Sequence, residues 1–340
     1  MRSFLKRKGI ECSWRTYFIT GLSYMALGLF ASLIIGLIMK TAGENIEPYI
    51  PAFSLLVDMG DLAMGLMGPA IGVAVAYGLK APRLVVFAAV ITGAAGAELA
   101  GPAGSFIAAV MSVEIGKLVS QETKIDIIVT PFVTIVSGFL TAYFIGPWIQ
   151  LALTQFGELI KWGTEQQPIL LGIIVATLMG LALTAPISSA ALAIMLELDG
   201  MAAGAATVGC AAQMIGFAVS SYRENRWSGL VALGIGTSML QVPNVMKNPL
   251  ILIPPVIAGA ILAPFATVMF QMSNSAAGAG MGTSGLVGPI LTISDMGLSI
   301  NVIVAIGLLH FIGPAIISLL VSEWMRKKGL IRFGDMKIDQ

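Results

Sequence analysis

Charged residues are scarce in this chain. They make up 11% of its 340 residues, against about 25% in an average soluble domain. Hydrophobic residues make up 57%, and the mean hydropathy is +0.91. A soluble globule of this length needs a polar surface that such a composition does not supply. The sequence therefore predicts a protein whose natural surroundings are largely lipid.

Cysteine and the usual catalytic patterns are equally scarce. The chain has two cysteines, Cys12 and Cys210, whose spacing fits neither a metal site nor a disulfide framework. We find no Ser/His/Asp pattern, no HExxH motif and no carboxylate pair at short helical spacing. The sequence thus predicts free thiols, no metal, no cofactor and no self-contained catalysis.

Histidine occurs once, as His310 in the middle of the apolar run 300–322. A lone histidine on a membrane helix usually hydrogen-bonds a neighbouring helix. We interpret His310 in this way, with a proton-carrying role as the alternative.

Basic residues gather at the two ends of the chain, although the net charge of +1 gives no indication of a nucleic-acid partner. Lysine and arginine beside membrane spans stay on the cytoplasmic side, so both termini are predicted to be cytoplasmic. Tails that bind anionic lipid are a compatible alternative. The basic residues at the ends are Arg2, Lys6, Arg7, Lys8, Arg15, Arg326, Lys327, Lys328, Arg332 and Lys337.

Apolar runs recur along the chain, and several are shorter than the roughly 20 residues of a simple span. Short, Gly-rich or Pro-broken runs are typical of re-entrant hairpins and discontinuous helices. We therefore predict an all-α polytopic membrane protein with about ten membrane segments, including re-entrant hairpins. The runs fall near 17–39, 62–79, 84–97, 103–119, 127–148, 168–185, 201–219, 229–242, 250–270 and 300–322.

The stretch 149–167 differs from the rest, because apolar residues alternate with polar ones at roughly helical spacing. This pattern predicts an amphipathic helix at the membrane surface, with an ordinary loop as the alternative. The predicted organisation is a basic tail, an N-terminal membrane half, this interfacial helix, a C-terminal membrane half and a second basic tail. Their bounds are 1–16, 17–148, 149–167, 168–325 and 326–340.

The tetrapeptide AAGA occurs twice, at 94–97 and at 276–279, each time before a Gly-rich stretch. Two halves related as an internal repeat would produce this. Chance recurrence in an Ala- and Gly-rich chain is the other explanation.

Polar groups within apolar stretches are costly in lipid and usually functional. Glu98 stands in AAGAELAGPAG, among residues too small to shield it. A carboxylate there accepts strongly from a sugar hydroxyl, so we expect Glu98 to bind substrate. A loop carboxylate at the membrane surface is the alternative.

The stretch VPNVMKNPLILIPP at 242–255 has two prolines, Pro243 and Pro249, that prevent a continuous helix. Freed backbone groups must then be satisfied by protein or by a wet cavity. The carboxamides of Asn244 and Asn248 suit polyol hydroxyls, and Lys247 suits a carboxylate or a phosphoryl group. We predict that all three bind substrate, with a cytoplasmic loop as the alternative.

Two further stretches supply weaker candidates. Arg223, in SYRENRWSG, is suited to a phosphate or a carboxylate, but a solvated turn explains this stretch equally well. Thr283 and Ser284, in GAGMGTSGLVGP, offer hydroxyls within a predicted re-entrant loop. Close helix packing through small residues is the alternative there.

Long parts of the sequence resemble a known family. The stretch AATVGCAAQMIGFAVSSYRENRWSGLVALGIGTSMLQVPNVMKNPLILIPP and the later SAAGAGMGTSGLVGPI resemble phosphotransferase-system enzyme IIC proteins of the perfringolysin O regulator-like type. The earlier GPAIGVAVAYGLKAPRLVVFAAVITGAAGAELAGPAGSFIAAV is more loosely similar to fructose-type enzyme IIC.

The resemblance implies a transporter of the bacterial cytoplasmic (inner) membrane, usually a homodimer. A partner, enzyme IIB, would phosphorylate the sugar on arrival inside. The Glu98 loop and the PNVMKNP stretch would line the substrate site. The chain departs from many relatives because its first sixteen or so residues leave no room for a fused IIB domain. Separate IIA and IIB partners are therefore expected.

The sequence supports more than one function. The first is transport of a small polar solute, a sugar or polyol, as the IIC component of a phosphotransferase system. The others are a ligand-binding membrane sensor or regulator, and a carrier not coupled to phosphorylation. A channel is weaker, because rings of selective charges or carbonyls are not evident. The identity of the solute and the topology of 186–247 stay open at this stage.

Overall fold

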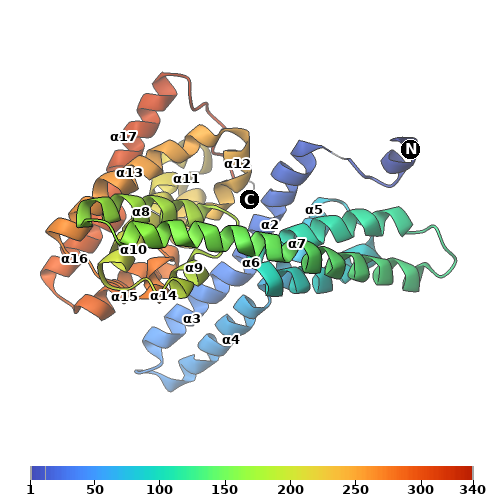
Figure 1. Ribbon diagram of the computed structural model, residues 1–340, viewed down its shortest axis with the longest axis horizontal. Helices are drawn as coiled ribbons and strands as arrows, with labels where there is room; N and C mark the ends of the chain where they lie inside the picture. Colours follow the sequence, from blue (N-terminus) through green and yellow to red (C-terminus); the bar gives the residue numbers. More distant parts are fainter. Residues whose placement is uncertain (1, 12, 339–340) are drawn as a thin grey trace. The chain divides into compact units, whose positions relative to one another are not determined.

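The computed structural model describes residues 2–11 and 13–338 (Figure 1). Within this part of the chain, all regular elements are helices, and the only β-pairing is an isolated bridge between Gly200 and Asn274. This confirms the all-α prediction. The chain forms two compact units, Met1–Ala152 and Leu153–Gln340, which we call unit 1 and unit 2.

Unit 1 starts with a short helix, followed by one long apolar helix that contains two π-helical turns. The short helix is α1 (Arg2–Arg7). The long helix consists of η1 (Arg15–Gly21), α2 (Leu22–Leu29), η2 (Phe30–Ile34) and α3 (Ile35–Ile46), and its π-helical turns are η1 and η2. A bent pair follows, with an angle of 52° between its two arms. The remaining elements are η3 (Pro51–Phe53), α4 (Ser54–Gly65), α5 (Met67–Gly78), α6 (Arg83–Val119) and α7 (Asp126–Thr164).

Helix α6 is a hairpin rather than a straight rod. Its backbone leaves the helical region at Ala100 and at Gly101, where φ is +58°. The two arms then pack against each other so closely that a Cβ on Gly96 would lie 2.4 Å from the carbonyl oxygen of Gly104. Further from the turn, Ser112 Oγ donates to Thr92 Oγ1 at 3.0 Å. The sequence runs 84–97 and 103–119 are therefore the two antiparallel arms of one helical hairpin.

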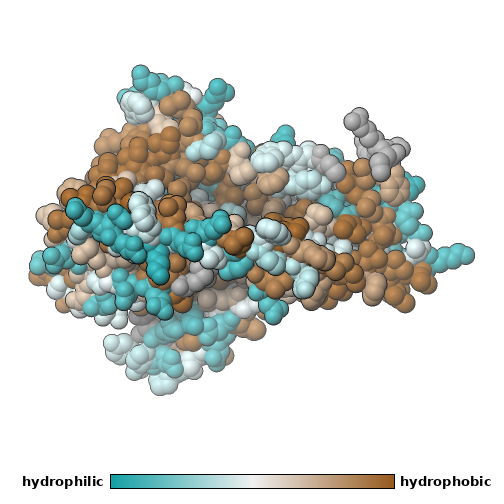
Figure 2. Space-filling view, in the orientation of Figure 1, coloured by the Kyte–Doolittle hydropathy of each residue, from teal (hydrophilic) through white to brown (hydrophobic). Residues whose placement is uncertain are grey.

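Helix α7 continues without a break through the stretch 149–164 that the sequence separates as an interfacial helix. Its 39 residues give a length of about 58 Å, whereas the hydrocarbon core of a bilayer is about 30 Å thick. Figure 2 shows apolar residues over the first half of α7 and hydrophilic residues along its second half. The length is compatible with a second half outside the hydrocarbon layer, so the interfacial location stays a prediction.

Unit 2 is built from shorter and more often interrupted helices. They are α8 (Pro168–Thr184), α9 (Ser189–Met195), α10 (Gly200–Ser220), α11 (Tyr222–Val231), η4 (Ala232–Gly236), η5 (Ser238–Gln241), α12 (Val242–Lys247), η6 (Pro249–Leu252), α13 (Ile253–Pro264), η7 (Phe265–Met269), α14 (Ala276–Ala279), η8 (Ser284–Leu286), α15 (Val287–Met296), α16 (Ile300–Ile306), η9 (Gly307–Ile312) and α17 (Gly313–Lys327).

Helix α10 is the centre of unit 2, since it packs against α8, α13 and α17. Most of its residues are buried, from Ala203 to Ser220. Its small residues allow close approach: a Cβ on Gly209 would lie 2.0 Å from the carbonyl oxygen of Ala176 in α8. Such contacts replace the hydrophobic driving force that is absent between helices in lipid.

Six described helices are long and apolar enough to cross a membrane, or seven if the bent pair α4–α5 counts as one span. The chain is thus a multi-pass membrane protein, but the count of ten segments is not confirmed. Two of the ten runs form the α6 hairpin, 168–185 is too short, and 229–242 is divided among α11, η4 and η5. The internal repeat stays a prediction.

Candidate functional site

A sharp turn after α10 organises the polar end of unit 2. Within α11 the backbone breaks at Arg226, with φ +53° and ψ −148°. This region of backbone space is normally accessible only to glycine, and another residue there costs of the order of 1–3 kcal/mol. The side chains of Arg226 and Trp227 are exposed on the turn. After it, η4 packs back against α10.

The next segment, residues 237–248, is broken as its two prolines predict. It contains the short helices η5 and α12, and extended residues bound it at Thr237 and Asn248. Both extended residues cap the helix that follows: Thr237 Oγ1 accepts from Met239 N at 3.1 Å, and Asn248 Oδ1 accepts from Leu250 N at 3.2 Å. The prolines therefore interrupt the helix while the backbone groups beside them find partners.

Four carboxamides in this region form a cluster, which we call the carboxamide cluster: Asn225, Gln241, Asn244 and Asn248. Their partners are main-chain groups near the C-terminus. Asn225 Nδ2 and Gln241 Nε2 both donate to the carbonyl of Met336, at 2.8 and 2.9 Å. Ile338 N donates back to Asn225 Oδ1 at 3.0 Å.

The two asparagines predicted from the sequence use both hydrogens of their amide groups. Asn244 Nδ2 donates to Gln241 Oε1 and to the carbonyl of Lys337, each at 2.8 Å. Asn248 Nδ2 donates to the carbonyl of Leu330 at 3.0 Å and to Asp335 Oδ2 at 2.8 Å. Neither amide group has a hydrogen left for another acceptor.

Residues 329–338, which we call the C-terminal segment, thus lie on the carboxamide cluster. Ile331, Met336 and Ile338 are buried in an apolar group that includes Phe217 and Met325. Lys247 is exposed and its Nζ lies 3.4 Å from Asn244 Oδ1. The stretch PNVMKNP therefore binds another part of the same chain.

Two ion pairs connect α11 to α17 beside the segment. Arg326 Nη2 donates to both carboxylate oxygens of Glu224, at 2.8 and 3.1 Å, and the side chains are 9% and 0% exposed. Arg223, a predicted site residue, pairs with Glu323 at 2.7 Å, and its side chain is 62% exposed. Gly334 N also donates to Glu224 Oε1 at 3.3 Å, which links the buried pair to the C-terminal segment.

A second group of polar side chains lies inside unit 2, around η4 and the start of η5. Thr184 Oγ1 lies 2.9 Å from Ser238 Oγ and 3.3 Å from Gln213 Oε1. Thr283 donates to the carbonyl of Gly234 at 2.6 Å, and Ser284 donates to the carbonyl of Gly236 at 2.8 Å. All five side chains are buried.

Glu98 lies in unit 1, three residues before the turn of the α6 hairpin at Gly101. It is exposed, and it makes no hydrogen bond or ion pair to any described residue. It is therefore the only predicted site residue whose charged group is free of other described residues.

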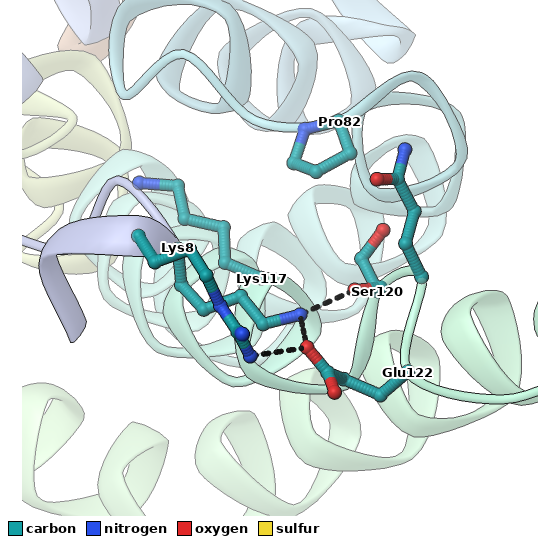
Figure 3. Close-up of a pocket in the computed structure, with 7 residues that line it drawn as sticks. Lys8, Pro82, Lys117, Ser120 and Glu122 are labelled. Carbon is teal, nitrogen blue, oxygen red and sulfur yellow. Dashed lines mark hydrogen bonds and ion pairs between the residues drawn. The ribbon is translucent and has the colours of Figure 1, made fainter. Parts of the chain in front are cut away.

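A polar pocket of about 400 Å³ lies where residues 4–10, which we call the N-terminal segment, meet the end of α6 (Figure 3). Lys8 binds the carboxylate of Glu122 and the carbonyl of Ser120, and Arg7 shares the same Glu122 oxygen at 3.1 Å. The hydrogen bond from Lys8, with the charges of Lys8 and Arg7, holds the pKa of Glu122 below its ordinary value of 4.5. Lys117, 2% exposed, pairs with Glu114 at 3.0 Å. Each cation that lines this pocket already contacts a carboxylate of the chain, and Arg7 and Lys8 share one.

One interpretation of the sequence is wrong. His310 is buried in η9, but within the described residues neither of its ring nitrogens has a hydrogen-bond partner. The expected bond to a neighbouring helix is therefore not made. Its neighbours in sequence are apolar, and the adjacent Leu309 belongs to an apolar cluster, which explains why no acceptor is within reach.

The structure brings four of the seven predicted residues to the C-terminal segment or beside it: Arg223, Asn244, Lys247 and Asn248. It places Thr283 and Ser284 in the second polar group and Glu98 in the other unit. Sequence reasoning did not name the other members of these two groups as candidates: Thr184, Gln213, Asn225, Ser238 and Gln241. The rule that polar side chains in apolar runs are costly would have found Gln213 and Gln241, in the runs 201–219 and 229–242.

A hairpin that turns back at a glycine, helices interrupted at prolines and buried polar groups beside the interruptions define a multi-pass membrane protein of the transporter type. A family model described as Phosphotransferase system, EIIC, matches residues 19–338. The chain belongs to this family and is a membrane component of the phosphotransferase-system IIC type. No curated protein and no solved structure matches it.

Proposed function

We propose that the protein carries a sugar or polyol across the bacterial cytoplasmic membrane, as the IIC component of a phosphotransferase system. A separate IIB protein, supplied by a IIA protein, would phosphorylate the solute on the inner side. The finer resemblance, to the perfringolysin O regulator-like type, belongs to the same proposal. A homodimeric state is also part of the proposal. So are cytoplasmic termini, which the basic clusters at both ends favour.

The observation that carries the proposal is the position of Glu98. A carboxylate near the turn of a membrane hairpin, without a partner among the described residues, is expensive unless a ligand or water satisfies it. A sugar or polyol offers hydroxyl donors to it. For unit 2 taken by itself, we propose that the second polar group and the carboxamide cluster also offer hydroxyl and amide groups to the solute, among them those of Asn244, Asn248, Thr283 and Ser284.

The proposal is tested by substituting Glu98 and measuring solute binding. Glu98→Gln keeps the shape and removes the charge, and we expect it to weaken binding of radiolabelled D-glucose, D-fructose or D-mannitol by about 10- to 100-fold. Glu165→Gln, an exposed residue between α7 and α8, is the matched control and should bind like the wild type. Unchanged affinity in Glu98→Gln would remove Glu98 from the site.

A ligand-binding sensor is the second candidate, because a C-terminal segment that lies on the predicted site residues offers a way to report occupancy. Proteoliposomes that contain the purified protein distinguish the candidates. Solute exchange across the membrane supports the carrier, and flux without any partner supports a carrier uncoupled from phosphorylation. Binding with no exchange, in the presence of IIB and IIA partners, supports the sensor.

A further inference from the structure

We infer that the carboxamide cluster is a binding site for main-chain carbonyl groups, and that the C-terminal segment occupies it in competition with the solute. The inference rests on the proposed function, because it names what controls solute access to the carboxamide cluster of unit 2. Its occupant is present in the structure: residues 329–338 of the same chain.

The cluster contacts the main chain of the segment far more than its side chains. Of the hydrogen bonds that the cluster donates to the described segment, four end on the carbonyls of Leu330, Met336 and Lys337, and one ends on a side chain, that of Asp335. Carbonyl oxygens and sugar hydroxyls both accept from a carboxamide N–H. A set of donors built for one is therefore chemically suited to the other.

The two kinds of ligand exclude each other. Asn244 and Asn248 each have two amide hydrogens, and the segment or a cluster neighbour takes all four. A solute hydroxyl can accept from these amides only after the segment has moved away. Occupancy by the segment and occupancy by the solute thus compete for the same hydrogens.

The segment can separate from the cluster without disrupting a helix. Helix α17 ends at Lys327, before the segment begins. Gly329 and Gly334 have φ of +73° and +97°, a backbone region in which glycine is unstrained. Phe333 at its middle is 77% exposed. Departure of the segment therefore breaks its hydrogen bonds to the cluster and uncovers the side chains of Ile331, Met336 and Ile338. It does not unwind a helix.

Population arithmetic gives the size of the effect. When only a fraction of the molecules has the site free, the apparent dissociation constant of the solute rises by the inverse of that fraction. Releasing the segment should therefore tighten solute binding, and locking it in place should weaken binding.

The release experiment uses full-length Met336→Asp. A carboxylate at this buried position expels the segment from its apolar group without changing any cluster residue. Phe333→Asp places the same charge in the same segment at an exposed position and is the matched control. We expect Met336→Asp to bind one of the radiolabelled probes, D-glucose, D-fructose or D-mannitol, about tenfold more tightly than the wild type, and Phe333→Asp to bind like the wild type.

A locked protein keeps the inference testable if Met336→Asp does not fold. Asn248→Cys with Asp335→Cys joins two side chains that are in contact, in a background in which Cys12 and Cys210 are replaced by alanine. The oxidised protein should bind the three probes at least about tenfold more weakly than the same protein after reduction. Comparing one protein in two redox states removes the effect of losing the Asn248 amide.

The outcomes separate the inference from the function on which it rests. Wild-type binding that neither the release nor the lock changes overturns the competition and leaves the proposed transport of a sugar or polyol intact. No binding of any probe by the wild type, the reduced protein or Met336→Asp overturns the proposed solute class, and the competition with it.

Discussion

Breaking the buried ion pair between Glu224 and Arg326 by removing one partner is expected to destabilise unit 2 strongly. The perturbation is Glu224→Gln, which keeps the shape and removes the negative charge. Arg326, 9% exposed, would then lose its two short contacts to a carboxylate and keep only the longer one, to Glu323 Oε1, at 3.8 Å from Nε. Removing one partner of a buried pair costs about 3–5 kcal/mol. Because glutamine keeps one oxygen acceptor, we expect about 3 kcal/mol.

The same two helices supply the control. Arg223 and Glu323 also pair between α11 and α17, but the side chains are 62% and 29% exposed. Exposed pairs contribute at most about 1 kcal/mol, so Glu323→Gln should have a much smaller effect. Both variants make the same chemical change opposite an arginine. Glu323 also lies 3.8 Å from Arg326 Nε, so Arg223→Gln, which removes the other partner of the exposed pair and leaves Arg326 with both carboxylates, is a second control.

The assay is denaturant-induced unfolding of purified protein in detergent, which gives the free energy of unfolding of each variant. A double variant, Glu224→Gln with Arg326→Met, should recover much of the loss, because no unpaired charge is left buried. Hydrogen exchange should also increase in the C-terminal segment, since Gly334 N donates to Glu224. Equal destabilisation by Glu224→Gln and Glu323→Gln would refute the role assigned to burial.

Three further predictions concern the hairpin, the strained turn and the N-terminal segment. Gly96→Ala should destabilise the protein by about 1–3 kcal/mol, because its Cβ would meet the main chain of the opposite arm. Gly65→Ala, with open space around it, should be neutral or stabilising in the same unfolding assay. Arg226→Gly should raise the free energy of unfolding by about 1–3 kcal/mol by relieving the backbone, whereas Ser228→Gly should lower it by about 0.5–1 kcal/mol. The pKa of Glu122 is lowered, so its contribution to holding the N-terminal segment is present above pH 4.5 and lost as the pH falls through the lowered pKa. Hydrogen exchange of residues 4–10 should therefore rise between pH 5 and about pH 3, and no change over that range would exclude this contact as the anchor.

The membrane character and the α6 hairpin could be predicted from the sequence, and for a clear reason. Gly101 and Pro102 interrupt an otherwise continuous apolar pattern, and only glycine adopts a φ of +58° without strain. A local signal of this kind depends on a few adjacent residues. The apolar runs 84–97 and 103–119 coincide with the two arms, because nothing distant in the chain is needed to specify the turn.

The turn at Arg226 shows the opposite case. It has nearly the same backbone angles as Gly101, yet an arginine stands there, so no local signal announces it. Tertiary contacts provide what the residue lacks: Asn225, just before it, binds Met336 and Ile338. Contacts between residues more than 100 positions apart fix this turn, and propensity read along the chain cannot detect them.

The carboxamides at 244 and 248 mark where reasoning from the sequence stops. Residue type and the flanking prolines correctly indicate that their amides need acceptors, because freed polar groups in this setting must be satisfied. They cannot specify which acceptor is used, since a carbonyl of the chain and a hydroxyl of a solute satisfy an N–H equally well. In the structure the carbonyls come from the C-terminal segment. In the proposed competition, the acceptor that is present depends on the free-energy difference between the docked and released segment, which would set how much of the protein is open to solute.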